Sequence, residues 1–186
     1  VRIVIGVVIA LIAVISYFMK TDENPATGER QKVSLTVDQE IQLGLQSAPE
    51  MIREFGGEYR DLKLQAYVDR IGDKLVRSTE AGSSPYKFDF RLLADASTVN
   101  AFALPGGQIF ITYALLSRLK TEDQLAGVLG HEIGHVINRH SAEHIAQQEL
   151  TEGLARATDI ATGDPGMISR FIGNMVNMKY GREDEL

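Results

Sequence analysis

Three residues in the second half of the chain have the types and the spacing that could hold and use a metal ion. They are His131, Glu132 and His135, in the sequence His-Glu-Ile-Gly-His. In an α-helix, residues four apart lie about 40° from each other around the axis, so both imidazoles project to one side and can share one ion. Zinc suits such a pair, because it accepts neutral imidazole nitrogen at ~2.0–2.1 Å and leaves a position for water.

Glu132 lies about 100° around the helix from His131, close to the ion but out of line with its two ligands. Its carboxylate could therefore reach a water molecule on the ion without binding the ion first. A metal lowers the pKa of such a water toward ~7, and Glu132 could pass the proton to a leaving amine. The pattern thus predicts amide hydrolysis, although three ordinary core or surface residues remain the alternative.

Two histidines do not complete a catalytic zinc site, which usually takes three protein ligands and a water. On an unbroken helix His140 and His144 would lie about 180° and 220° from His131, and could join the site only if the helix broke near Asn138. We therefore expect them to be structural or surface residues, and expect a carboxylate as third ligand. The carboxylates that follow the motif are Glu143, Glu149, Glu152, Asp159, Asp164, Glu183, Asp184 and Glu185.

The motif is predicted to lie on a long helix that begins at the N-cap residue Thr121. Apolar residues form a broad arc around the polar trio. Gly127, Gly130 and Gly134 lie on the other side, where another element could pack closely.

Strands are predicted in one block before this helix. Residues 88–92 alternate between apolar and polar as a half-buried strand does, and the stretch 99–104 is ambiguous. Pro105-Gly106-Gly107 is a turn, after which residues 108–112 resume as a strand. Helices are expected from about Val37, after the cap Asp61, over 114–119 and over about 165–180. Strands in one block with flanking helices predict the α+β class.

Residues 1–19 are apolar apart from Arg2 and are long enough to span a membrane. We expect residues 1–20 to be a transmembrane anchor, 21–36 a linker and 37–186 a catalytic domain. A cleaved signal peptide is the stronger alternative and a buried core helix the weaker one. The chain begins without Met and ends after a charged run, so we expect a fragment at both ends.

Composition excludes several classes of protein. The formal net charge is −6 and no cluster of Lys and Arg stands out, which argues against nucleic-acid binding. The chain has no cysteine, so a disulfide scaffold, a thiolate zinc site and a cysteine nucleophile are excluded.

The stretch from Asn100 to His144 resembles the zinc metallopeptidase family M48, a gluzincin-type group, and the resemblance extends more weakly back to about Val37. It implies a mostly helical, zincin-like domain with a small β-sheet and one Zn²⁺ per chain. The family's third ligand is the first Glu of a Glu-x-x-Ala-Asp motif. By position Glu185 matches it, beside His131 and His135, with Glu132 as the catalytic base.

The resemblance also implies that a strand edge beside the metal binds substrate in extended form. Its residues here are Asn100, Ala101, Phe102, Gly106 and Gly107, although the turn containing the two glycines could be an ordinary hairpin turn. Backbone pairing at such an edge gives affinity with little demand on sequence.

Together these features predict a membrane-anchored zinc metalloendopeptidase for unfolded, misfolded or membrane-associated proteins. Arg2 before the apolar stretch and Asp22 and Glu23 after it weakly favour a periplasmic or extracytoplasmic catalytic domain. The alternatives are a zinc-stabilised, chaperone-like binding module with little turnover and a hydrolase of non-peptide amides. The sequence does not specify the oligomeric state.

Overall fold

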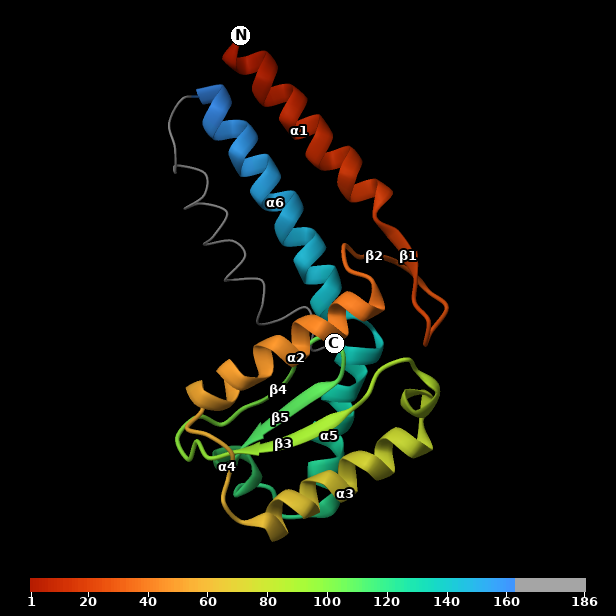
Figure 1. The fold of residues 1–186 in the computed structure, drawn as a ribbon, viewed down its shortest axis with the longest axis vertical. Helices are drawn as coiled ribbons and strands as arrows, with labels where there is room; N and C mark the ends of the chain where they lie inside the picture. Colours follow the sequence, from red (N-terminus) through yellow and green to blue (C-terminus); the bar gives the residue numbers. More distant parts are fainter. Residues whose placement is uncertain (163–186) are drawn as a thin grey trace. The chain divides into compact units, whose positions relative to one another are not determined.

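The computed structural model describes residues 1–162 and combines helices with two small sheets (Figure 1). The α+β prediction is confirmed, whereas the helix expected over about 165–180 lies outside the described residues. In chain order the elements are α1 (Arg2–Met19), β1 (Thr21–Glu23), β2 (Arg30–Lys32), α2 (Val37–Glu54), α3 (Leu62–Ser78), the 3-10 helix η1 (Glu80–Ser83), β3 (Asp89–Leu93), β4 (Ala101–Ala103), β5 (Gln108–Thr112), α4 (Tyr113–Leu116), α5 (Glu122–Ile137) and α6 (His140–Thr162).

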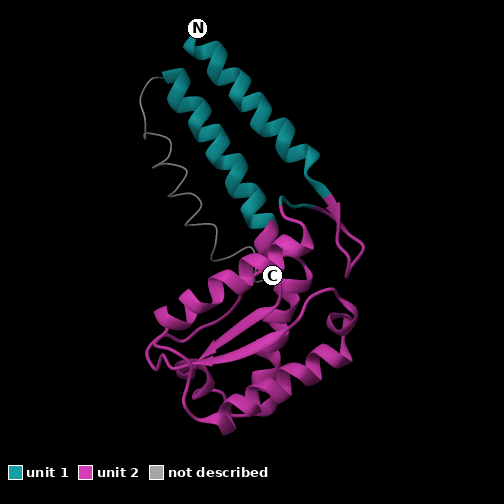
Figure 2. Cartoon of the chain, viewed as in Figure 1, with its two compact units in different colours: residues 1–21, 32–34, 143–186 teal, residues 22–31, 35–142 magenta. Residues whose placement is uncertain are grey.

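The chain forms two compact units (Figure 2). Unit 2 contains residues 22–31 and 35–142, and therefore the predicted metal-binding motif. Unit 1 contains residues 1–21 and 32–34 together with the chain from 143 onward. The boundary falls inside α6, whose first three residues belong to unit 2.

The three-stranded sheet of unit 2 has the order β3-β5-β4. β5 pairs in parallel with β3 and antiparallel with β4, and all five of its residues are buried. Side chains alternate between the two faces of a strand. Ile109 and Ile111 accordingly join the main core with residues of α3 and α5, and Phe110 joins a smaller cluster with Ala48 of α2. The ambiguous stretch 99–104 forms the edge strand β4.

The predicted caps fix where two helices begin. The Asp61 side chain accepts a hydrogen bond from the backbone N–H of Lys63 at 2.8 Å, and α3 follows. The Thr121 hydroxyl accepts from the backbone N–H of Gln124 at 3.2 Å, and α5 follows. Both caps satisfy backbone donors that have no partner inside the helix.

Helix α2 lies directly against the turn between β4 and β5, and the contact depends on glycine. A Cβ atom on Gly44 would lie 2.0 Å from the carbonyl oxygen of Pro105. Gly106 has φ of 85°, and a Cβ there would lie 2.4 Å from the Cα of Ile41. The two glycines therefore set how closely the helix approaches the turn that ends β4.

We expect Gly44→Ala to lower the free energy of unfolding by about 1–3 kcal/mol, because backbone atoms cannot make room for the methyl group without moving the helix. Urea denaturation measures the change. Gly127→Ala is the matched control, since no described atom lies within 4 Å of its Cβ position. That variant should gain roughly 0.5–1 kcal/mol from helix propensity. Equal effects of the two substitutions would contradict this account of the packing.

Residues 21–36, which the sequence predicts to be a linker, form hydrogen bonds with the C-terminal end of α5. The buried Asn24 side chain donates to the carbonyl of Ile137 at 2.8 Å, and Gln31 donates to that of Asn138 at 2.6 Å. Helix C-termini leave such carbonyls without a partner in the helix. At least residues 24–31 are therefore part of the structure that holds α5.

A sharp corner at Arg139 separates α5 from α6. Arg139 is the only described non-glycine residue with positive φ, at 56°. Its buried guanidinium donates to Glu40 through Nε at 2.8 Å, to Asp22 at 3.0 Å and to the carbonyl of Leu35 at 2.8 Å. This left-handed conformation is costly for a residue with a side chain, so the network at its guanidinium holds the corner in place.

Within unit 1, α1 packs on α6 through small residues. A Cβ on Gly6 would lie 2.6 Å from the carbonyl oxygen of Ala157, and one on Gly153 would lie 2.7 Å from the Cβ of Ala13. Lys20, after α1, forms an ion pair of 2.5 Å with Glu149. Most large apolar side chains of α1 are nevertheless exposed, and α1 is the only described helix long and apolar enough to cross a membrane.

Candidate active site

His131 and His135 turn the same ring nitrogen toward a common point. They lie one turn apart on α5, and their Nε2 atoms are 2.9 Å apart. Two imidazole nitrogens around a tetrahedral zinc at ~2.0–2.1 Å would be roughly 3.3 Å apart. The observed pair therefore fits a zinc ion after a small side-chain adjustment, and the predicted convergence of the two imidazoles is present.

Glu132 is buried beside this pair, with 8% of its surface exposed. Burial raises the pKa of its carboxyl, and the neighbouring His131 opposes this rise. A carboxylate in such an environment holds a proton more readily than one in water. That property suits a group that must accept a proton and then release it.

His140 lies closer to the motif than an unbroken helix would allow. α5 ends at Ile137 and the chain turns at Arg139, so the helical phase that placed His140 on the far side does not apply. Its Nδ1 lies 2.7 Å from Nδ1 of His135, with ring centroids 4.8 Å apart. The loss of apolar phasing after Ile137 is the sequence signal for this break. His144 follows one turn further along α6.

No third ligand joins the two histidines among the residues that the structure describes. Within residues 1–162 no group of three His, Cys, Asp or Glu side chains is arranged to hold a metal ion. Glu185, which the family resemblance implies, lies outside this range. Its role as a ligand stays a prediction.

The predicted substrate-binding strand lies beside the motif helix, since β4 packs against α5. Thr112 N–H donates to the carbonyl of Asn100 at 3.0 Å, and Leu104 N–H donates to that of Gln108 at 2.8 Å. Residues along an antiparallel strand alternate in direction. Ala101 and Ala103 therefore direct their N–H and C=O groups away from β5, where no other described strand pairs with them.

The Phe102 side chain is partly buried and packs against two aromatic rings. Its ring stacks on Phe110 with centroids 5.0 Å apart and packs against Phe55 at 5.1 Å. It thus anchors the edge strand from the α2 side, while Ala101 and Ala103 pack against the main core. Substrate binding along the outward backbone of β4 stays a prediction.

Gly106 and Gly107 have packing roles that account for their residue type. Gly107 has φ of 111°, and a Cβ there would lie 2.6 Å from the carbonyl oxygen of Lys87. Gly106 faces α2 in the same way. Contact of either glycine with substrate stays a prediction.

The glycine face of α5 is open in the part of the chain that the structure describes. No atom lies within 4 Å of a Cβ built on Gly127, Gly130 or Gly134. The close packing expected there is thus absent among residues 1–162. Residues 1–162 thus leave this side of the motif helix uncovered.

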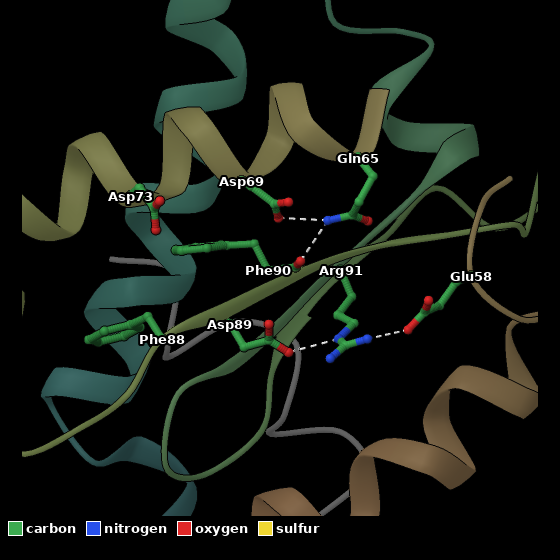
Figure 3. A pocket seen from close by; sticks show the side chains of 8 residues that line it. All are labelled: Glu58, Gln65, Asp69, Asp73, Phe88, Asp89, Phe90 and Arg91. Carbon is green, nitrogen blue, oxygen red and sulfur yellow. Dashed lines mark hydrogen bonds and ion pairs between the residues drawn. The ribbon is translucent and has the colours of Figure 1, made fainter. Parts of the chain in front are cut away.

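A separate hollow of about 370 Å³ lies between α3 and β3 (Figure 3). Five of its polar side chains pair with one another: Arg91 with Asp89 at 2.7 Å and with Glu58, and Gln65 with Asp69 at 2.6 Å. None of its lining residues belongs to the motif. The residues that line it are Glu58, Gln65, Asp69, Asp73, Phe88, Asp89, Phe90 and Arg91.

Comparison with known proteins identifies the family. Residues 62–186 match the model of peptidase family M48. The chain belongs to this metallopeptidase family. It is 30% identical over 162 residues to the mitochondrial metalloendopeptidase OMA1 of Schizosaccharomyces pombe, covering 85% of this chain and 47% of that protein. It is 31% identical over 136 residues to the beta-barrel assembly-enhancing protease of Escherichia coli, covering 72% and 26%.

The M48 match confirms the predicted family. A second OMA1, from Saccharomyces cerevisiae, is 29% identical over 100 residues, which cover 53% of this chain and 29% of that protein. The chain therefore spans about half or less of the length of the curated relatives that it matches.

Proposed function

We propose that this M48 chain is a zinc-dependent endopeptidase whose ion is held by His131, His135 and Glu185. The observation that carries the proposal is the convergence of two imidazole Nε2 atoms beside the buried carboxylate of Glu132. Nitrogen and carboxylate donors around an open position are the ligand set of catalytic zinc. Family membership supports the same assignment.

A bound zinc ion would polarise the scissile carbonyl and acidify a water molecule. Glu132 takes the proton of the attacking water and delivers it to the leaving amine. Its place between the two histidines in sequence keeps it within the same turn of α5, and its burial excludes competing solvent from the carboxylate.

Substrate binds in this proposal as an added strand along the outer edge of β4. Ala101 and Ala103 supply the backbone donors and acceptors, because their N–H and C=O groups point away from β5. Main-chain pairing accepts many sequences, so the site suits unfolded or misfolded polypeptide. The chain's similarity to a mitochondrial metalloendopeptidase and to a beta-barrel assembly-enhancing protease supports a role in protein quality control.

We further propose that α1 anchors the protein in a membrane as a single N-terminal span. The helix has a mean hydropathy of 2.5 over 18 residues, close to the ~20 residues that a bilayer requires. Most of its large apolar side chains are exposed rather than packed, as lipid contact would require. The catalytic domain would lie on the periplasmic or extracytoplasmic side.

The direct test is to measure zinc content and cleavage of an unfolded casein-type substrate by the full-length protein. We expect one zinc per chain, loss of cleavage on chelation and recovery when zinc is restored. Glu185→Ala should weaken zinc binding, because two imidazoles alone hold the ion poorly. A zinc-loaded protein that binds unfolded chains without cutting them would instead identify a chaperone-like module.

A further inference from the structure

We propose that His140 is a positioning residue that holds the ring of His135 and so aims the metal-binding nitrogen of that ring. The inference rests on the proposed zinc site and adds to it a residue that orients one of the zinc ligands. The observation is the contact of 2.7 Å between Nδ1 of His140 and Nδ1 of His135.

The two nitrogens of the His135 ring have different partners. Nε2 faces His131 at 2.9 Å, and Nδ1 faces His140 at 2.7 Å. A neutral imidazole carries one proton, so a ring that binds a metal through Nε2 has its N–H at Nδ1. Nδ1 of His140 is placed to accept that hydrogen bond, which requires its own proton to be on Nε2.

This arrangement also separates the role of His140 from that of a ligand. His131 and His140 contact opposite nitrogens of the same ring, so they lie at different edges of His135. One ion cannot bind both and still bind Nε2 of His135. Metal-ligating histidines usually give their second N–H to a group that fixes the tautomer and the ring orientation, and here a third imidazole provides that group.

The corner at Arg139 brings His140 to this place. Had α5 continued, His140 would lie about 140° around the helix from His135. Instead Arg139 takes a φ of 56°, and α6 begins at once, with Ala142 N–H donating to the Arg139 carbonyl at 2.9 Å. The rings of His135 and His140 therefore come into contact because the chain turns at Arg139, and not because of their spacing along a helix.

The test compares His140→Leu and His140→Asn with the wild type in the full-length protein. Zinc affinity is measured by competition with a chelator, and the ligand field by the absorption spectrum of the cobalt-substituted protein. His140→Leu removes the acceptor and should weaken zinc binding ~10–100-fold, with a changed cobalt spectrum. His140→Asn should restore most of the affinity, because its Oδ1 can accept the same hydrogen bond near the position of Nδ1.

Three results would overturn the inference. The first is a His140→Leu protein with the zinc affinity and cobalt spectrum of the wild type. The second is a His140→Asn protein that does not recover zinc affinity, which would indicate that His140 is a direct ligand. The third is a further loss of zinc affinity when His140→Leu is added to His135→Ala. Circular dichroism of the metal-free variants shows whether they fold, and His140→Asn keeps the inference testable if His140→Leu does not. A wild-type protein that binds no zinc would instead overturn the proposed function.

Discussion

Glu132→Gln should retain zinc and lose proteolysis by a factor of ~10²–10⁴, the range that a positioned general base contributes. The amide has nearly the shape of the carboxylate but cannot accept the proton of the attacking water. Since burial already disfavours the charge at this position, the neutral side chain should fit without loss of fold. Initial rates of casein-type cleavage and zinc content, measured on the same preparation, provide the test.

Glu122→Gln is the matched control, because it makes the same chemical change in the first turn of the same helix. Its carboxylate lies 3.6 Å from Lys74 and 3.9 Å from Arg70, in long, partly exposed pairs that contribute little to stability. The control should cleave at the wild-type rate. Full cleavage by Glu132→Gln would remove Glu132 from the proposed chemistry.

The parts of the fold that the sequence predicts are those governed by local rules. Asp61 and Thr121 are caps because a short polar side chain before an apolar helical pattern can bond the free backbone donors. β5 is evident from its short run of β-branched and aromatic residues directly after a turn. The pair of imidazoles follows from the period of the helix alone, which is why His131 and His135 converge as expected.

The parts that the sequence does not predict depend on partners far along the chain. Arg139 meets Glu40, 99 residues away, and Asn24 meets the Ile137 carbonyl, 113 residues away. Neither pairing has a periodic signal, and Asn24 belongs to a polar segment with turn signals that is typical of a linker. The position of His140 depends on both contacts, so helical spacing alone places it on the wrong side.

Arg139→Ala should destabilise unit 2 by about 3–5 kcal/mol, the usual cost of removing one partner of a buried ion pair. Glu40 is 1% exposed and would retain only the Tyr86 hydroxyl, at 3.1 Å, among the side-chain partners seen here. Burial already raises the pKa of Glu40, with Arg139 opposing the rise. In the variant the pKa should rise further, so the folded state binds a proton as pH falls. The destabilisation should therefore be largest at pH values above the raised pKa of Glu40 in the folded state. It should become smaller as the pH falls from that pKa toward the pKa of Glu40 in the unfolded chain.

Urea denaturation at neutral and mildly acidic pH measures this loss, and two further variants assign its cause. Arg91→Ala also removes a guanidinium paired with two carboxylates, but Arg91 is 39% exposed, so the loss should be no more than ~1 kcal/mol. Replacing Arg139 by Met and Glu40 by Leu together should recover most of the stability, because no buried charge is left without a partner. If the double variant were as unstable as Arg139→Ala, the stability loss would come from the left-handed corner, which the guanidinium stabilises, and not from an unpaired buried charge.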